Sequence, residues 1–413
     1  MVDINAVIFS TESYPKDITT LVAVFIVSIL TTISGIGGGS LMVPLFMIIN
    51  GFSINTAVPL SVATIVGSTI VRIVYFYNKE HPRVSGRSLI YYFPILIIVP
   101  FITNFSFLGI ILADLMPNVI TAIIILILLG YTFYKTLMNG IKKFRQEHAK
   151  SENKRIITND EKNTLRTSII EFDGIELNTE IDSHTAHPNA KDNIKKNITM
   201  TLFLIAIIAF GSVFSTVRKK YDNCGLENIS LIVFQVVIIS AIGLLICLLI
   251  HIELQARRDN NYLMTESDII FSKKSVAKII IISSLTGILA TYIGIGGGSL
   301  IVPLMIHLGI SPDVVVATGS MSALFTALIS TINYLIDSKL LWKYALSYMA
   351  SSSLGACAGI LLLNKLVSKK HQSYIIFIVA ALVLTSTVLL IINLIISQGF
   401  NAFIEMKIND ICK

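Results

Sequence analysis

The most distinctive chemical feature of the sequence is a glycine-rich motif that occurs twice. The string GIGGGSLMVPL at residues 35–45 returns as GIGGGSLIVPL at residues 294–304. In each copy an apolar segment runs into the glycines and a shorter apolar segment leaves them. Glycine adopts backbone angles that other residues avoid, and it lets a ligand approach the main chain closely. The motif therefore predicts two helix breaks whose reactive groups are backbone amides.

An anion is the ligand that such breaks favour. The first amides of the outgoing helix have no partner within the helix, and the positive end of the helix dipole lies beside them. Anions bind there without a basic side chain. Ser40 and Ser299 are expected to be the N-cap residues, with Pro44 and Pro303 near the first turn. The candidate substrate-binding residues of the motif are Gly37, Gly38, Gly39, Ser40, Pro44, Gly296, Gly297, Gly298, Ser299 and Pro303.

Two other interpretations of the glycines remain open. Small residues also allow close packing of membrane helices, which needs no ligand. A phosphate-cradling or dinucleotide-binding loop is the second alternative, but the motif lacks the Lys-Ser/Thr pair and the βαβ context of such loops.

The composition indicates that lipid surrounds the elements that carry the motif. Of 413 residues, 54% are hydrophobic and 14% are charged, too apolar for a water-soluble globule. The net charge of +7 comes from loops beside apolar stretches, which indicates membrane orientation and no nucleic-acid binding. Ten apolar windows predict an integral multi-pass protein of the plasma membrane or an organelle membrane. They are 18–50, 56–77, 88–112, 118–138, 198–217, 229–251, 275–308, 313–336, 341–363 and 373–397.

The duplicated motif divides the chain into two homologous halves. We predict an all-α polytopic membrane protein with two inverted repeats, each a glycine-broken re-entrant hairpin plus three spans, and with two extra spans between them. The predicted regions are an N-terminal tail (1–17), the first transmembrane repeat (18–138), a polar cytoplasmic loop (139–197), the two additional spans (198–251), a basic loop (252–274), the second transmembrane repeat (275–397) and a C-terminal tail (398–413).

Lengths and loop charges both support the hairpins. The outgoing arm 41–50 spans about 15 Å, half of the roughly 30 Å hydrocarbon core, and the incoming arm 18–33 about 24 Å. The basic loops 252–274 and 364–372 can share the cytoplasmic side only if residues 275–308 turn back. Arg218, Lys219 and Lys220 conflict with this scheme, because it puts them outside.

Several single side chains are further candidates. The hydroxyls of Ser61, Thr318 and Ser320 follow the hairpins and could contact an oxyanion, or they could bond their own helix. Arg72 is a candidate charge partner for the anion, with snorkelling to the interface as the alternative.

Histidine and asparagine side chains add weaker hypotheses. His307 is a candidate for a coupled proton or an interfacial hydrogen-bonding residue. Asn104 and Asn333 could line a path or join helices by hydrogen bonds. The four cysteines lack the spacing of a disulfide framework or zinc site, and no catalytic motif such as HExxH or GxSxG is present. We therefore expect no cofactor, no bound metal and no enzymatic activity.

The doubled motif, each copy followed by a Ser/Thr-bearing helix, resembles the TauE/SafE sulfite-exporter family over about residues 18–138 and 275–397. The resemblance implies transport of sulfite, sulfoacetate or other organosulfonate anions. The long loop and extra spans of 139–251 resemble longer eukaryotic members. The family's Ala-x-x-Thr-Ser stretch is altered in both copies, at residues 57–61 and 315–320.

Together these features predict a transporter of small anions, of the sulfite or organosulfonate type, that works by alternating access to a midplane site. Its partners would be the anion, a coupled proton and the lipid bilayer. An anion channel and a non-transporting membrane receptor or scaffold are the alternative functions.

Overall fold

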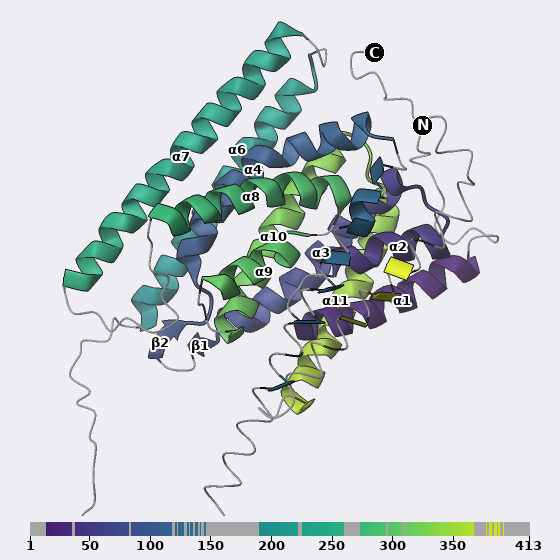
Figure 1. Ribbon diagram of the computed structural model, residues 1–413, viewed down its shortest axis with the longest axis horizontal. Helices are drawn as coiled ribbons and strands as arrows, with labels where there is room; N and C mark the ends of the chain where they lie inside the picture. The colour runs from purple at the N-terminus through teal and green to yellow at the C-terminus, as the bar shows by residue number, and fades with distance from the viewer. Residues whose placement is uncertain are drawn as a thin grey trace, which may run out of the picture.

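The computed structural model is a bundle of long helices with one short pair of strands (Figure 1). It describes residues 14–34, 38–81, 84–117, 190–221, 225–259, 273–294, 296–308, 310 and 312–366, together with separate helical residues between 120 and 145 and between 377 and 391.

The described helices fall into two matching sets of four with a pair between them. The first set is α1 (Tyr14–Ser34), α2 (Gly39–Ile49), α3 (Ile54–Tyr77) and α4 (Tyr92–Leu115). The pair is α6 (Ala190–Arg218) and α7 (Leu226–Asp259). The second set is α8 (Lys273–Ile293), α9 (Gly298–His307), α10 (Pro312–Ile336) and α11 (Trp342–Leu366). The two sets match element by element, as the duplicated motif predicts.

Eight of the described helices are long and apolar enough to cross a membrane. They are α1, α3, α4, α6, α7, α8, α10 and α11. Helices α2 and α9 are not among them, since they have only 11 and 10 residues. Within the predicted windows 118–138 and 373–397 the structure describes scattered residues, all of them helical. The incoming arm is longer than predicted: α1 has 21 residues, about 32 Å rather than about 24 Å.

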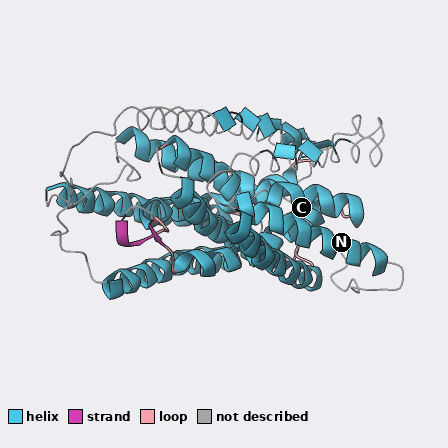
Figure 2. Ribbon diagram, turned by 90° about the horizontal axis from the view of Figure 1, so that it is seen from below, coloured by secondary structure: helices cyan, strands magenta, loops and turns pink. Residues whose placement is uncertain are grey.

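The only strands among the described residues form a two-stranded hairpin in the α3–α4 connection. Strand β1 (Glu80–His81) pairs antiparallel with β2 (Val84–Ser88), with Glu80 opposite Ser88. Figure 2 shows the two strands beside the helix ends. This segment lies between the predicted spans 56–77 and 88–112, where no strand was predicted.

The two sets of helices pack on each other reciprocally. Helix α1 packs on α11, and α8 packs on α4; α3 packs on α11, and α10 packs on α4. The equivalent helices α3 and α10 also contact each other, and they lie in the middle of the bundle in Figure 1. Each pair therefore has a counterpart in which the two halves have exchanged roles.

The reciprocity extends to single residues. A Cβ added to Gly109 in α4 would lie 2.5 Å from the Ile288 carbonyl oxygen in α8. A Cβ added to Gly359 in α11 would lie 2.8 Å from the Ile29 carbonyl oxygen in α1. In the register of the glycine motif, Ile288 is the equivalent of Ile29. The same backbone-to-glycine contact thus holds both halves together.

Helices α6 and α7 lie side by side along one edge of the bundle (Figure 1). Their outer faces expose large apolar side chains, among them Leu202, Phe203, Leu248 and Leu249. Such a continuous apolar exterior is stable only in contact with lipid or another apolar surface. Their inner faces pack on α4.

Candidate functional site

The first glycine break separates α1 from α2. Residues 35–37, including Gly37, lie outside the described residues, and Gly38 is the N-cap of α2. The φ angle of Gly38 is 77°, in the left-handed region, and a Cβ there would lie 2.9 Å from the Thr31 side chain. Both the angle and the contact favour glycine at this position.

Helix α2 runs back along α1 after this break. Asn50 directly follows α2, and its Nδ2 donates to Asp17 Oδ1 at 3.1 Å. Thr20 Oγ1 donates to Asn50 Oδ1 at 2.5 Å. Because Asp17 and Thr20 lie near the start of α1, the end of α2 has returned to the level at which α1 begins.

The second break separates α8 from α9, and its left-handed glycines occupy other motif positions than Gly38, whose equivalent Gly297 has no positive φ angle. Gly294 and Gly296 both have φ angles of 75°, and α9 begins at Gly298. A Cβ added to Gly297 would lie 2.9 Å from Thr326 Cβ in α10. The break is therefore closely packed against α10, and a larger residue at Gly297 would force the helices apart.

The second break also contacts the first half. A Cβ added to Gly294 would lie 3.2 Å from Val43 in α2 and 3.2 Å from Val58 in α3. Ser61 Oγ in α3 lies 3.0 Å from the Gly294 carbonyl oxygen and donates a hydrogen bond to it. The helix that leaves the first break thus packs directly against the second break.

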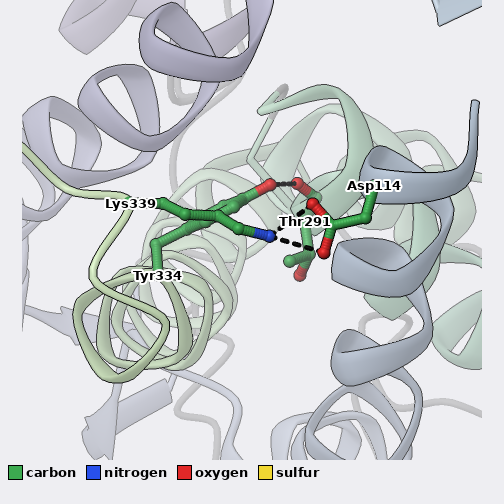
Figure 3. Close-up of polar contacts among 4 residues, drawn as sticks. All are labelled: Asp114, Thr291, Tyr334 and Lys339. Atoms are coloured by element: carbon green, nitrogen blue, oxygen red, sulfur yellow. Dashed lines mark hydrogen bonds and ion pairs between the residues drawn. The ribbon is translucent and has the colours of Figure 1, made fainter. Parts of the chain in front are cut away.

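Carbonyl groups at the end of α8 are capped by donors. Gly294 N–H donates to Ala290 O at 3.0 Å, and Tyr334 Oη donates to Thr291 O at 2.5 Å. Figure 3 shows Tyr334 reaching Thr291 from α10. With Ser61 on Gly294 O, three carbonyls of the break region, those of Ala290, Thr291 and Gly294, are paired. These carbonyls at the end of α8 are therefore paired, whereas the first amides of α9 have no partner within their helix. This difference gives the break a net positive polarity.

The serine N-caps predicted from sequence are wrong. Helix α2 begins at Gly39 with Gly38 as its N-cap, and α9 begins at Gly298, so Ser40 and Ser299 lie inside the first turns. Gly38 can occupy the left-handed region that ends the preceding turn, which lets the helix start earlier than a serine cap allows.

The motif prolines also lie deeper than predicted. Pro44 is the sixth residue of α2, and Pro303 has the same place in α9. A proline in a helix cannot donate to the carbonyl four residues earlier. The carbonyls of Ser40 and Ser299 therefore have no helical partner, and each first turn retains backbone polarity at both ends.

The candidate hydroxyls are buried, and each already has a hydrogen-bond partner in its own helix or in a neighbouring element. Besides Gly294 O, Ser61 Oγ bonds Val58 O at 2.7 Å. Ser320 Oγ donates to Val316 O at 2.8 Å. Thr318 Oγ1 accepts from the Tyr91 N–H at 3.0 Å, which ties the start of α4 to α10. These side chains brace the breaks and the repeat contacts.

Arg72 does not snorkel to an interface. Its side chain is 1% exposed, and none of its three guanidinium nitrogens has a hydrogen-bond partner among the described residues. It lies eleven residues after Ser61 in α3, about 16 Å along the helix. A buried charge without a partner is costly, and it is the strongest positive feature inside the described bundle.

The two asparagines join helices. Asn104 Nδ2 donates to Ser240 Oγ in α7 at 2.9 Å, and Asn333 Nδ2 in α10 donates to Ser106 Oγ in α4 at 3.0 Å. Both therefore make the interhelical bonds that one of the two hypotheses predicts. The side chain of His307 lies outside what the structure describes.

Charged residues gather where α4, α6 and α10 end. Lys339 Nζ lies 2.5 Å and 2.6 Å from the two carboxylate oxygens of Asp114 (Figure 3). Lys219 Nζ donates to the Ile336 carbonyl and to Ser338 Oγ. The basic group that conflicts with the predicted orientation therefore has a local role, since it docks α6 on the α10–α11 turn.

Sequence reasoning missed Tyr334 and Thr291, which cap the second break. A tyrosine in an apolar helix gives no local signal of its partner, because the acceptor lies 43 residues away. Among the described residues no group of three or more His, Cys, Asp or Glu could hold a metal ion.

The eight apolar helices, with their lipid-facing exteriors and buried polar breaks, define an integral multi-pass membrane protein. The profile of the family described as "Sulfite exporter TauE/SafE" matches residues 15–170 and 184–390. The chain therefore belongs to the sulfite exporter TauE/SafE family, whose members are membrane transporters.

Curated relatives support the same family. The chain is 24% identical over 373 residues to Sulfite exporter TauE/SafE family protein 2 of Arabidopsis thaliana, covering 89% of this chain and 80% of the relative. It is 24% identical over 380 residues to family protein 5 of that plant, with 89% and 80% covered. Family protein 1 is 24% identical over 389 residues, with 92% and 83% covered. No solved structure matches the chain.

Proposed function

We propose that this protein transports a small oxyanion of the sulfite or organosulfonate type. The anion binds where the second glycine break packs against α2 and α3. The observation that carries the proposal is the contact of Gly294 with Val43 and Ser61, which unites the two broken-helix regions. The names of the family and of its relatives support the sulfite class.

Backbone amides supply most of the binding in this proposal. The N-terminal turns of α2 and α9 present N–H groups and the positive ends of two helix dipoles, each worth about 0.3–1 kcal/mol for an anion near a surface and more where water is excluded. The hydroxyls of Ser61, Thr318 and Ser320 line the adjacent helices. To donate to a ligand, Ser61 and Ser320 would have to leave their present carbonyl partners. Thr318 Oγ1 is instead the acceptor in its bond with the Tyr91 N–H.

Placement in the bilayer follows from the helix lengths. Helix α2 is about 16 Å long, roughly half of the hydrocarbon core, and it returns along α1. We therefore infer that α1–α2 and α8–α9 are re-entrant hairpins whose tips lie inside the membrane. The reciprocal packing of the two sets supports an inverted repeat, in which one half rocks against the other to expose the site alternately.

Arg72 has a separate role in this proposal. Its distance along α3 from Ser61 places it away from the break itself. An unpaired guanidinium in the bundle raises the local concentration of anions and penalises cations. We propose that it lies on the path between the site and one membrane face.

Uptake by proteoliposomes tests the function. The purified protein is expected to take up radiolabelled sulfite with saturable kinetics and to show counterflow, which a channel does not. Sulfate, thiosulfate, sulfoacetate and taurine, each tested as a competitor, define the substrate class. Absence of saturable uptake of all five compounds by folded protein contradicts the proposal.

Two glycine variants test the site. Gly38→Leu and Gly297→Leu are expected to lower uptake more than tenfold, because the new side chains collide with Thr31 and Thr326. Gly130→Ala is the matched control, since a Cβ there meets nothing within 4 Å. Normal transport by both folded leucine variants would show that the glycine breaks do not form the site.

A further inference from the structure

A second buried polar cluster lies at the opposite end of α2 from its glycine break. Asp17 is 2% exposed, and Thr20 is fully buried. Asn50 links both side chains through the two hydrogen bonds described above. Tyr348 of α11 completes the group. We call Asp17, Thr20, Asn50 and Tyr348 the α2-end cluster.

Tyr348 points an unused polar group into this cluster. Its side chain is 1% exposed, and its hydroxyl has no hydrogen-bond partner of ordinary geometry among the described residues. The ring stacks on Phe46 of α2 with a centroid distance of 4.8 Å, and it lies near Asp17, Thr20 and Asn50. A buried hydroxyl that lies beside Thr20 and Asn50 without forming a well-aligned hydrogen bond can accept a further partner.

The fold does not require polar residues at these positions, because the second half does without them. In the register of the glycine motif, the equivalents of Asp17 and Thr20 are Val276 and Ile279. In the register of the paired glycines Gly109 and Gly359, the equivalent of Tyr348 is Ile98. Ile279 and Ile98 are each 1% exposed and belong to one apolar cluster, against which Val276 packs. A buried carboxylate where the equivalent site is apolar is costly, so its retention indicates a function.

The chemistry of the cluster suits a cation. The cluster offers the Asp17 carboxylate, the Asn50 amide oxygen and two hydroxyl oxygens. It also lies at the C-terminal end of α2, where the helix dipole is negative and favours positive charge. Oxygen ligands at the C-terminal ends of half-helices are the usual setting of coupling ions in repeat-built transporters.

We propose that the α2-end cluster binds a monovalent cation, a proton or a sodium ion, whose occupancy is coupled to the anion at the glycine breaks. The coupling element is α2, which joins the two sites as one rigid segment about 16 Å long. Neutralising Asp17 weakens its bond from Asn50 and frees the end of α2, which in turn shifts Gly39 at the other end. The coupling part of this inference rests on the proposed anion transport, whereas the cation site does not.

Other ionisable groups near the cluster are few. Helix α2 carries none. The remaining groups on the packed helices are Tyr14 and Lys16 of α1, Arg72, Tyr75 and Tyr77 at the far end of α3, and Lys343, Tyr344, Cys357 and Lys365 of α11. None of these is a second carboxylate, so a change at Asp17 isolates the proposed site from the general titration of the protein.

Thermal unfolding of the purified full-length protein tests the cation site without any anion. The midpoint is measured while sodium chloride replaces potassium chloride at constant ionic strength, and separately between pH 5 and pH 8. Wild-type protein is expected to respond to sodium, or to respond to pH beyond the change that Asp337 causes. Asp17→Asn is expected to lose that sodium response or that additional pH response, and to keep the part of the pH profile that comes from Asp337. Asp114→Asn, which alters a half-exposed carboxylate elsewhere, should behave like the wild type. An equal response of Asp17→Asn and the wild type overturns the proposal.

Milder variants keep the test decisive if Asp17→Asn does not fold. Thr20→Val and Tyr348→Phe retain the carboxylate and remove one oxygen each. Each is expected to weaken the apparent cation affinity at least threefold. Unchanged affinity in both variants contradicts the assignment of the cluster.

Sulfite uptake separates the cation site from the proposed function. In proteoliposomes, a gradient of the coupled ion should drive net sulfite uptake, and Asp17→Asn should lower this driven uptake at least fivefold, with a smaller effect on sulfite exchange. Gradient-driven uptake that is the same in Asp17→Asn refutes the coupling. A cation-dependent unfolding midpoint without any sulfite flux leaves the cation site standing and refutes the proposed substrate.

Discussion

Ser61 and Gly294 are joined by a hydrogen bond of 3.0 Å although 233 residues separate them in the chain. The donor lies in α3 of the first half and the acceptor lies at the glycine break of the second half. A carbonyl at a helix break has no helical partner, and leaving such a group buried and unpaired costs about 1–3 kcal/mol. The bond therefore fixes the relative position of the two halves at the break.

Replacing Ser61 by alanine is expected to destabilise the protein by about 1–3 kcal/mol, because the Gly294 carbonyl loses its donor. Saturable sulfite uptake should fall with it. Ser68→Ala is the matched control, since Ser68 lies in the same helix, is 3% exposed, and bonds only the Ile65 carbonyl of its own helix. Equal losses of stability in the two variants would show that the Ser61–Gly294 hydrogen bond contributes no more to the free energy of unfolding than a bond within one helix.

Arg72 gives a prediction in which stability and activity change in opposite directions. Arg72→Met removes a buried charge that has no partner and keeps most of the side-chain volume. Because burying a charge without a partner is costly, its replacement by an apolar side chain is expected to raise the unfolding midpoint. Anion uptake is expected to fall at least fivefold, because the positive charge on the path is lost.

Arg72→Lys separates charge from shape in the same experiment. A lysine keeps the charge but not the planar guanidinium, so uptake should be intermediate. A fall in stability together with unchanged uptake in Arg72→Met would mean that Arg72 has only a packing role. Thermal unfolding and initial uptake rates on the same preparations provide both measurements.

The paired glycines Gly109 and Gly359 predict matched effects in the two halves. Alanine at either position places a Cβ less than 3 Å from a carbonyl oxygen of the facing helix. Overpacking of this kind costs about 1–3 kcal/mol. Both variants should lower the unfolding midpoint by similar amounts, and Gly130→Ala should not. A large effect at one glycine alone would show that the two helix pairs are not equivalent.

Local sequence signals predicted the elements but not their partners. The repeated glycines at 37–39 and 296–298 indicated two breaks, and α2 and α9 do begin at Gly39 and Gly298. Apolar length indicated the long helices, because a span needs about 20 apolar residues. These signals lie within one element, and a single sequence is sufficient to see them.

Contacts across the repeat had no such signal. The partner of Tyr334 is a backbone carbonyl, which any residue carries, so nothing at Thr291 marks it in the sequence. The burial of Arg72 depends on which helices cover the end of α3, so its sequence position near Asn78 was equally compatible with snorkelling. The N-cap error at Ser40 has a local cause, since glycine at 38 competes with serine for the start of the helix.

Asp337, just after α10, predicts a dependence of stability on pH. Burial raises the pKa of its carboxyl, Asp114 also raises it, and Lys339, Arg218 and Lys219 oppose the shift. A raised pKa in the folded state means that this group favours folding most below its unfolded pKa, about 4. Its contribution is lost as the pH rises through the folded pKa.

Asp337→Asn is therefore expected to raise the unfolding midpoint above pH 6 relative to the wild type, and to reduce the fall in stability between pH 4 and pH 7. The asparagine is neutral at every pH and has nearly the same size, so the titration of this group disappears while the turn is kept. Asp114→Asn should lower stability by no more than about 1 kcal/mol, because its pair with Lys339 is largely exposed. If Asp337→Asn keeps the wild-type pH profile unchanged, the prediction is wrong. The cations of α6 and the α10–α11 turn would then offset the cost of burying the ionised Asp337 carboxylate in full.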